Sequence, residues 1–435
     1  MGNADQTSLA SLRALTRNLP NNGDTSLCSG DGGCSSAMRT RSGRIVRFGE
    51  VTLPASKSES NRALMIAAYG GFAPDFQNLS DSNDTQVLNE ALVSMSFQCG
   101  VVRGRESMHT KASFIDIADC GTAARFMTTY MACHEGEWIL MGTERMKQRP
   151  ILPLVKSLRE IGADIQFVEK EGCLPLRIKG KPITGGEARI DMHQSSQFAS
   201  SLLLAAPMWP EGLEMDLVGE LTSLPYLEMT LTMMRHFGAE VERNGRTISV
   251  NPKPYQSNSF VVSGDWSAAS YWYEMAALSE ECEIRLRGLS LSSLQGDVVI
   301  VDWMKQLGVG TFVEKDAIVL RKIPFEKHSV CFDFAAHPDL YPTMAATCAG
   351  LNVDATFTGL DNLALKESDR VGAMQAELSK LGSRPLQFCS HNDHRIVMAL
   401  APLALLYGPI SFDHPEVVEK SYPGFWSDCP FLQAL

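Results

Sequence analysis

The sequence lacks an excess of positive charge, a long apolar run and any cysteine pair with metal-binding spacing. It has 39 lysines and arginines against 50 aspartates and glutamates, and a formal net charge of −11. A protein that wraps nucleic acid or coats an anionic membrane needs a broad basic surface, so this balance argues against both partners. The longest apolar stretches, such as residues 396–406, are well short of the about 20 residues that span a bilayer. We therefore expect no nucleic acid and no membrane as partners.

The cysteines, the histidines and the missing glycine motifs exclude further classes. The 11 cysteines are odd in number and scattered, with no C-x-x-C pair, so we expect free thiols in a reducing, cytoplasmic compartment. His391 and His394 have no matching carboxylate pattern, which favours structural histidines over a metal site. No P-loop, no dinucleotide-binding glycine turn and no Gly-x-Ser-x-Gly elbow occurs, so nucleotide binding and serine hydrolysis are not indicated.

Residues 1–42 are rich in serine, glycine, asparagine and threonine. Such a composition buries too little apolar surface to offset the entropy of ordering the chain. We expect a disordered leader. Its arginines among serines would suit an organelle transit peptide, whereas its three aspartates oppose that interpretation. A misassigned start is the remaining alternative.

The rest of the chain repeats one pattern, in which an apolar-periodic helix is followed by a glycine and then by a strand-like run. The four clearest helices end at Gly162, Gly238, Gly308 and Gly382, where glycine is the expected C-terminal cap. Successive glycines are 76, 70 and 74 residues apart. Helix–glycine–strand joins occur in any α/β chain, but this spacing favours a repeated αβ unit, with about six copies in the chain. A boundary is expected near 252–259.

Small, hydrogen-bonding and cationic residues gather where helices are expected to begin. Residues 56–62 lead into a helix-forming run, with serines that can cap free N–H groups and with Lys57 and Arg62 beside them. Similar groups occur at 119–125, 145–150, 195–197, 366–370, 392–395 and 420–423. Any one of them is ordinarily a capped helix with surface cations. Several in an acidic protein predict a pocket for a small polyanion, because arginine matches carboxylates and phosphates.

These motifs, in this order, resemble the 5-enolpyruvylshikimate-3-phosphate synthase (3-phosphoshikimate 1-carboxyvinyltransferase) family, in the form found in Bacteroidetes-type bacteria. The resemblance covers roughly residues 43–435. Its motifs are LPASKSESNR at 53–62, GTAAR at 121–125, RMKQRP at 145–150, SSQ at 195–197, GDWSAAS at 264–270, KESDR at 366–370 and NDHR at 392–395.

The resemblance implies an α/β protein with the two-domain enolpyruvyl transferase fold. In this inside-out, α/β barrel-like fold, each domain has three βαβαββ repeats, in agreement with the six units expected from the spacing. The first domain would comprise 54–263 and the second 43–53 with 264–435. The active site would lie in the cleft between them. A monomer is expected.

The implied reaction is the transfer of the enolpyruvyl group of phosphoenolpyruvate to the 5-hydroxyl of shikimate 3-phosphate, on the shikimate pathway to chorismate and the aromatic amino acids. It proceeds by addition and elimination through a tetrahedral intermediate. By the resemblance, Asp339 takes the hydroxyl proton, Glu367 acts at C3 of phosphoenolpyruvate, and Lys57 binds phosphoenolpyruvate and carries a proton. No cofactor and no metal are implied.

The resemblance also assigns ligands for both substrates. Those of phosphoenolpyruvate are Lys57, Gly121, Arg145, Gln197, Arg370, Arg395 and Lys420. Those of shikimate 3-phosphate are Lys57, Ser58, Arg62, Ser195, Ser196, Gln197, Ser223, Asp339, Asn362 and Lys366, with Tyr226 a weaker candidate for the ring face.

Two departures from the family pattern keep alternatives open. Asp119 stands where the family usually has asparagine or a small neutral residue, and its charge would repel phosphoenolpyruvate unless Arg125 or Arg145 neutralises it. It also predicts altered binding of glyphosate, the competitive inhibitor of the family. Only nine residues separate Gly382 from Asn392, which predicts a truncated repeat near 382–392. A catalytically impaired anion-binding homologue is one alternative, and a UDP-N-acetylglucosamine enolpyruvyl transferase is another.

Overall fold

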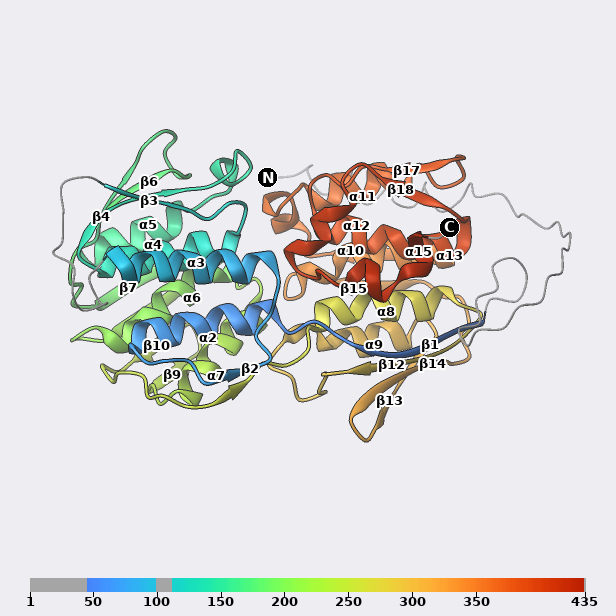
Figure 1. Ribbon diagram of the computed structural model, residues 1–435, viewed down its shortest axis with the longest axis horizontal. Helices are drawn as coiled ribbons and strands as arrows, with labels where there is room; N and C mark the ends of the chain where they lie inside the picture. Colours follow the sequence, from blue (N-terminus) through green and yellow to red (C-terminus); the bar gives the residue numbers. More distant parts are fainter. Residues whose placement is uncertain (1–44, 99–111, 434–435) are drawn as a thin grey trace, which may run out of the picture. The chain divides into compact units, whose positions relative to one another are not determined.

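The structure is a computed structural model that describes residues 45–98 and 112–433, and the leader expected at 1–42 lies outside them. The described residues form two compact units. The first unit comprises residues 55–262, and the second comprises 263–433 together with the preceding segment 45–54. The chain therefore enters the first unit after Pro54 and leaves it after Val262 (Figure 1).

The first unit has six α-helices and ten strands among its described residues. The helices are α2 (Lys57–Gly70), α3 (Asn83–Gln98), α4 (Gly121–Cys133), α5 (Leu152–Glu160), α6 (Ser196–Ala205) and α7 (Leu224–His236), with 3-10 turns η1 (Met146–Gln148) and η2 (Ala206–Met208). The strands are β2 (Phe76–Gln77), β3 (Ser113–Asp116), β4 (Gly136–Met141), β5 (Asp164–Phe167), β6 (Leu176–Gly180), β7 (Gly186–Asp191), β8 (Leu213–Val218), β9 (Val241–Asn244), β10 (Thr247–Val250) and β11 (Phe260–Val261).

The second unit combines its helices with several short 3-10 segments. The strands are β1 (Ile45–Thr52), β12 (Glu281–Arg287), β13 (Val309–Glu314), β14 (Ala317–Lys322), β15 (Val330–Asp333), β16 (Ala355–Thr358), β17 (Leu386–Phe388) and β18 (Ile410–Phe412). The helices are α8 (Trp266–Leu278), α9 (Ile300–Lys305), α10 (Tyr341–Leu351), α11 (Arg370–Leu378), α12 (His394–Leu400), α13 (Ala404–Tyr407), α14 (Phe425–Asp428) and α15 (Pro430–Gln433), and the 3-10 segments are η3 (Gly296–Val299), η4 (Pro338–Leu340), η5 (Asp361–Leu365), η6 (Ala401–Leu403) and η7 (Pro415–Lys420).

Each unit is built from strand–helix–strand repeats whose two strands pair in parallel. In the first unit the repeats are β3-α4-β4 and β7-α6-β8, and β11 from the end of the unit pairs with β2, which follows α2. In the second unit they are β15-α10-β16 and β17-α12-β18, and β1 pairs with β12, which follows α8. Since parallel neighbours need a crossover helix, each repeat buries one helix.

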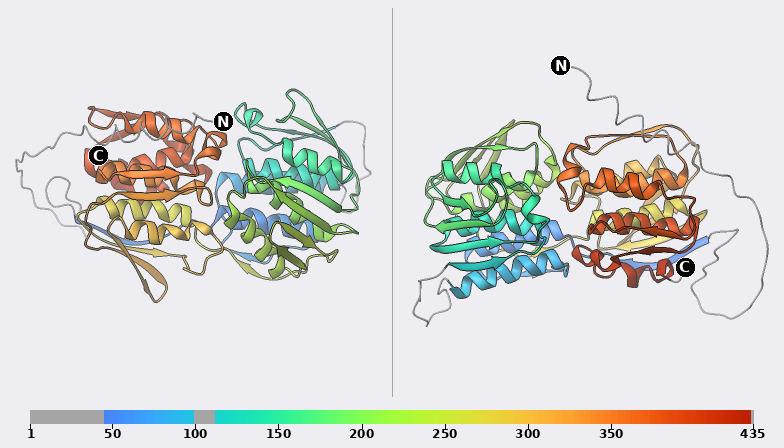
Figure 2. Two further views of the ribbon diagram at one scale, coloured as in Figure 1. Left: turned by 180° about the vertical axis from the view of Figure 1, so that it is seen from behind. Right: turned by 90° about the horizontal axis from the view of Figure 1, so that it is seen from above.

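Helices fill the middle of the first unit, and its sheets lie outside them. Helices α2, α3, α4 and α6 pack side by side (Figure 1). Figure 2 shows the green strands of this unit on the outer side of its helices. Because the helices of this unit pack against one another, the first turns of α2, α4 and α6, where its cationic and serine motifs lie, belong to one helical layer.

A helix precedes each of the four glycines that predicted helix ends, namely α5, α7, α9 and α11. Gly162 and Gly238 directly follow the capping residues Ile161 and Phe237. Gly308 and Gly382 lie two and three residues beyond the caps, because α9 and α11 end earlier than the sequence predicts. All four glycines have positive φ angles, of 95°, 86°, 84° and 102°, a backbone conformation that favours glycine.

The sheets differ in completeness. The three four-stranded sheets, β3-β4-β6-β5, β7-β8-β10-β9 and β1-β12-β14-β13, each contain the full βαβαββ pattern. The β2–β11 sheet of the first unit and the β15–β16 and β17–β18 sheets of the second have only their parallel pair within the part of the chain that the structure describes. The described residues of each unit therefore show fewer than three four-stranded repeats. The β15–β16 sheet lacks its antiparallel pair because the segment 379–393 holds only β17, and β18 is followed by η7, α14 and α15 instead of strands.

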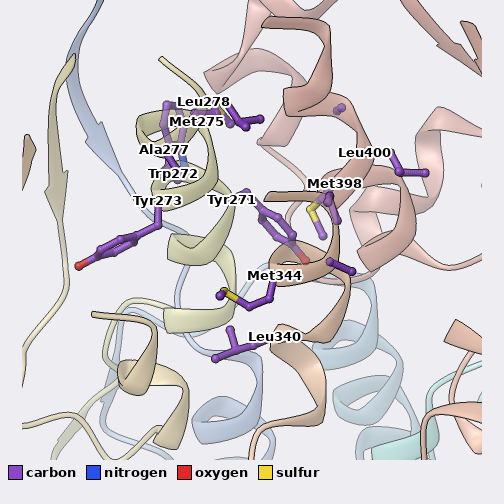
Figure 3. Packing of buried hydrophobic residues seen from close by; sticks show 14 of the residues in the cluster. Tyr271, Trp272, Tyr273, Met275, Ala277, Leu278, Leu340, Met344, Met398 and Leu400 are labelled. Atoms are coloured by element: carbon purple, nitrogen blue, oxygen red, sulfur yellow. The ribbon is translucent and has the colours of Figure 1, made fainter. Parts of the chain in front are cut away.

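The core of the second unit surrounds α8, which is mostly apolar and buried on all faces. Figure 3 shows Tyr271 and Tyr273 leaving α8 in opposite directions, with Met398 of α12 on the side of Tyr271. Glu274 directly follows Tyr273 in the sequence and is equally buried. Among the described helices, none is both long and apolar enough to cross a membrane.

Candidate active site

The first turn of α2 pairs its lysine with a carboxylate of α3. Ser56 is extended, and its hydroxyl accepts a hydrogen bond from the Glu59 amide at 3.4 Å, which caps the helix. Lys57 is the first residue of α2, and its Nζ lies 2.8 Å from Oδ2 of the buried Asp84. Lys57 is thus a cation held in a defined position near a helix N-terminus, where an anion is favoured.

Arg62 is buried and fixes α2 against α7. Its Nε donates to Thr230 Oγ1 at 2.7 Å, and its two terminal nitrogens donate to the Ser58 carbonyl at 3.0 Å and the Tyr226 carbonyl at 3.1 Å. Burial lowers the pKa of Arg62 to about 10, so the guanidinium stays charged at neutral pH. Its position therefore depends on the packing of the whole unit.

The N-termini of α4 and α6 lie close together. Cys120 Sγ accepts from the Ala123 amide at 3.3 Å and caps α4, and Ser195 Oγ accepts from the Gln197 amide at 3.2 Å and caps α6. Gln197 Nε2 donates to Thr122 Oγ1 at 3.2 Å. The structure therefore brings Gly121, the first residue of α4, and the serine motif of α6 into one corner.

Two arginines surround Gly121. Arg125 donates to the Gly121 carbonyl at 3.0 Å and to the Pro150 carbonyl at 2.8 Å. A Cβ atom at position 121 would lie only 2.7 Å from Nη1 of Arg149. A side chain at position 121 would therefore displace Arg149, a residue to which the sequence pattern gave no role. Arg145 is partly exposed and lies on the same connection, directly before η1.

The remaining candidates of the first unit lie at helix starts. Ser196 is the buried first residue of α6. Ser223 precedes α7 with a left-handed φ of 52° and is buried, and Tyr226 is half-buried in the first turn of the same helix. Asp119 is partly exposed and directly precedes the cap of α4.

The second unit gathers its candidate catalytic carboxylates on one guanidinium. Arg370, the buried first residue of α11, donates to Asp339 Oδ1, Glu367 Oε2 and Asp393 Oδ2, each at 2.8 Å. Arg395 on α12 donates to the other oxygen of Asp339, also at 2.8 Å. The two predicted acid–base residues are thus joined by one arginine, and Asp339 is held by two.

This arrangement sets the protonation of Asp339. Burial alone raises the pKa of Asp339, but the positive charges of Arg395, Lys366 and Arg370 outweigh it and hold that pKa well below its usual range. Burial likewise lowers the pKa of Arg370, and the carboxylates of Asp393, Glu367 and Asp339 raise it above its ordinary value. Asp339 is therefore ionised and Arg370 charged at neutral pH, and Asp339 becomes an effective base only when arginine contacts leave it.

The other candidates of the second unit lie on its 3-10 segments. Asn362 on η5 is buried, and its Oδ1 has no hydrogen-bond partner among the described residues. Lys366 directly follows η5 and raises the positive charge around Asp339. Lys420 ends η7 and is buried. No set of three metal-binding side chains gathers in the described parts of the chain.

Sequence comparisons identify the family. The EPSP synthase (3-phosphoshikimate 1-carboxyvinyltransferase) family pattern matches residues 46–429. The 3-phosphoshikimate 1-carboxyvinyltransferase of Bacteroides fragilis (strain YCH46) is 42% identical over 399 residues, which cover 87% of this chain and 93% of that protein. The chain belongs to the EPSP synthase family. A relative from Sulfurovum sp. (strain NBC37-1) with the same enzyme name is 35% identical over 408 residues, or 87% of this chain and 95% of that one.

Two solved structures, an EPSP synthase and an enolpyruvyl transferase, share the fold. EPSP synthase from Acinetobacter baumannii superposes with a TM-score of 0.67 at 21% identity, over 89% of this chain and 96% of that one. The enolpyruvyl transferase NikO from Streptomyces tendae gives a TM-score of 0.61 at 15% identity, over 90% and 96%. The expected family and the two-domain enolpyruvyl transferase fold are both confirmed.

Several residues around the EPSP synthase motifs were missed from sequence. Asp84, the partner of Lys57, lies 27 residues away in a polar run without a distinctive signature. Asp393 is part of the NDHR motif, but its motif alone does not reveal its contact with Arg370. Tyr271 on α8 is buried beside Arg395, and burial raises the pKa of its hydroxyl. An apolar helix gives no sign of that neighbour.

Proposed function

We propose that this chain transfers the enolpyruvyl group of phosphoenolpyruvate to the 5-hydroxyl of shikimate 3-phosphate and releases phosphate. Membership of the EPSP synthase family supports this reaction. The observation that carries it is the buried cluster in which Arg370 bridges Asp339 and Glu367. Addition followed by elimination needs two acid–base groups among fixed positive charges, and this cluster supplies both.

The proposed steps balance protons as follows. Asp339 takes the proton of the 5-hydroxyl of shikimate 3-phosphate, and the hydroxyl oxygen bonds to C2 of phosphoenolpyruvate. In the same step Glu367 delivers a proton to C3. The resulting tetrahedral intermediate then loses a proton from C3 back to Glu367, and the bond between C2 and the phosphate oxygen breaks. Lys57 gives a proton to the departing phosphate, and the proton held by Asp339 returns to Lys57 through solvent, so that all three groups regain their starting state.

Phosphoenolpyruvate also prepares the base. Its carboxylate and phosphate compete with Asp339 for the guanidinium groups of Arg370 and Arg395, which now contact both oxygens of Asp339. Each arginine contact that moves to the substrate raises the pKa of Asp339 toward neutral pH. The carboxylate therefore gains basicity when the substrate is bound.

The substrate ligands follow the motifs in both units. For phosphoenolpyruvate we propose Lys57, Gly121, Arg145, Gln197, Arg370, Arg395 and Lys420. For shikimate 3-phosphate we propose Lys57, Ser58, Arg62, Ser195, Ser196, Gln197, Ser223, Asp339, Asn362 and Lys366. The unbonded Oδ1 of Asn362 supports its role, because a buried acceptor without a partner is costly and a substrate hydroxyl would satisfy it. Arg62 contributes charge, since most of its donors are bonded within the unit.

Phosphate release tests the proposal directly. Purified protein with both phosphoenolpyruvate and shikimate 3-phosphate should release phosphate, whereas either substrate alone should not. Shikimate without its phosphate and UDP-N-acetylglucosamine serve as alternative acceptors, and neither should support turnover. Glu367→Ala and Lys57→Met should abolish release in folded protein. Folded wild-type protein that releases no phosphate would overturn the proposal.

We also propose that the chain acts as a monomer in the cytoplasm. The eight cysteines of the described residues are all free thiols, which supports a reducing compartment. Sedimentation of the purified protein tests the monomer, and localisation of the tagged full chain tests the compartment.

A further inference from the structure

The connection between α11 and α12 is shorter than the corresponding one between α5 and α6, which holds β5, β6 and β7. Helix α11 ends at Leu378 and α12 begins at His394, and the residues between them include only the three-residue strand β17. The β15–β16 sheet therefore has no antiparallel strand pair in the described residues. Another interaction must hold this connection, because it leads directly to Asp393 and Arg395.

Glu377 provides that interaction from the last turn of α11. It is 2% exposed. Its Oε2 accepts from Lys380 Nζ at 2.5 Å and from the Cys389 amide at 2.9 Å, and its Oε1 lies 2.9 Å from Nε2 of His391. Burial raises the pKa of Glu377, but these donors outweigh it and lower that pKa below its usual value. The buried carboxylate therefore binds the connection at the backbone amide of Cys389 and at the side chain of His391.

The bound segment, residues 389–393, has a tightly turned backbone. His391 and Asn392 both have left-handed φ angles, 51° and 52°, a conformation that costs free energy in residues other than glycine. Asp413, which follows β18, accepts from the Ser390 amide at 2.7 Å. The segment keeps this turn because side chains of two neighbouring elements hold it.

The other end of the segment enters the candidate site. Asp393 accepts from Arg370 Nε at 2.8 Å and from the Ser368 hydroxyl at 3.0 Å, and it caps α12 by accepting from the Arg395 amide at 3.0 Å. Arg370 and Glu377 stand at the two ends of α11, about 10 Å apart along the helix axis. Two attachments this far apart fix both the position and the rotation of the segment.

We propose that Glu377 is a positioning residue for Arg395. Through Cys389 and His391 it holds residues 389–393 in the turn that places Arg395 for phosphoenolpyruvate, and it replaces the strand pair that this repeat lacks. It does not touch substrate. This inference rests on the proposed function, since Arg395 acts there as a ligand of phosphoenolpyruvate and not of shikimate 3-phosphate.

The role predicts a selective kinetic effect. Without the carboxylate, the Cys389 amide and His391 lose their acceptor, and the segment with Arg395 shifts. Small displacements of a substrate ligand cost up to about a hundredfold in rate or affinity. For Glu377→Ala we expect about a tenfold rise in the KM for phosphoenolpyruvate. The KM for shikimate 3-phosphate should stay within about twofold of wild type, because Arg370 still holds Asp339.

Glu314→Gln is the matched control. Glu314 on β13 also accepts from two cationic side chains, Arg285 Nη1 at 2.9 Å and Arg321 Nη2 at 2.8 Å, and no proposed ligand contacts it. Thermal unfolding is measured for each variant. The conservative Glu377→Gln should restore part of the affinity, since its amide oxygen still accepts from the Cys389 amide. If Glu377→Ala does not fold, Glu377→Gln and His391→Ala test the positioning role instead. Each should raise the KM for phosphoenolpyruvate about threefold.

The outcomes separate this inference from the proposed function. A selective rise in the KM for phosphoenolpyruvate, partly restored by glutamine and absent in Glu314→Gln, supports the positioning role. An unchanged KM for phosphoenolpyruvate, or equal rises for both substrates, overturns it. Wild-type protein without turnover overturns the proposed function instead, before any variant is compared.

Discussion

Glu274 should make the second unit less stable as the pH rises. This residue of α8 is fully buried, and neither carboxylate oxygen has a hydrogen-bond partner among the described residues. Burial raises its pKa well above the ordinary 4.5. In the unfolded chain the group ionises near its ordinary pKa, whereas in the fold it keeps its proton. The unfolded state therefore gains free energy on ionisation that the folded state does not.

The magnitude follows from this difference in protons. Stability is greatest below the ordinary pKa and falls as the pH rises, by about 1.4 kcal/mol per pH unit until the raised pKa is reached. Glu274→Gln has a similar shape and no titration, so this slope should disappear. Glu274→Met also removes the unpaired polar group and should stabilise the fold by about 1–3 kcal/mol.

The assay compares unfolding free energies of wild type and Glu274→Gln at pH 5, 6 and 7. Unfolding by urea is followed through the hydrogen exchange of peptides from α8, so that the measured free energy refers to the second unit. The difference between the two proteins should grow by about 1.4 kcal/mol for each pH unit. Glu281→Gln, at the exposed start of β12, controls for the loss of one negative charge. Parallel curves for wild type and Glu274→Gln would refute the argument.

Three further substitutions test the site. Arg370→Met leaves Asp339, Glu367 and Asp393 without their shared partner. Because buried charges become unpaired, it should lower the free energy of unfolding, measured with urea, by about 3–5 kcal/mol. A loss below about 1 kcal/mol would contradict the bridging role. Gly121→Ala should displace Arg149 and raise the KM for phosphoenolpyruvate with little change in melting temperature, because the methyl group meets the flexible end of that side chain; an unchanged KM would count against it. Asp119→Asn removes a negative charge beside the start of α4. At low salt it should lower both the KM for phosphoenolpyruvate and the inhibition constant of glyphosate by about threefold. An unchanged inhibition constant would contradict the proposed charge effect.

The repeats could be predicted from sequence because their signals are local. A glycine that ends a helix needs a positive φ wherever it occurs, so Gly162 and Gly238 mark the ends of their helices without knowledge of the fold. The serine caps at Ser56 and Ser195 are similarly local, and the structure shows both. Helix starts with cations therefore indicated which residues carry chemistry.

The partners of those residues could not be predicted, because they come from distant parts of the chain. Arg62 bonds to Thr230, 168 positions away, and Arg395 bonds to Asp339, 56 positions away. Such pairs depend on how the repeats pack. The positioning role of Glu377 also lay outside sequence reasoning. The sequence predicted the short connection between the two helices, but it did not indicate that the carboxylate of Glu377 binds it.

The central claim is that Asp339, Glu367 and Lys57 carry out enolpyruvyl transfer by proton addition and elimination at C3 of phosphoenolpyruvate. Turnover in deuterated water, followed by mass spectrometry of the product, tests it most directly. The account predicts release of phosphate and formation of enolpyruvyl shikimate 3-phosphate, part of which carries deuterium at its vinyl carbon. Glu367→Ala should form neither product. Product without deuterium, or unchanged substrates with folded protein, would contradict it.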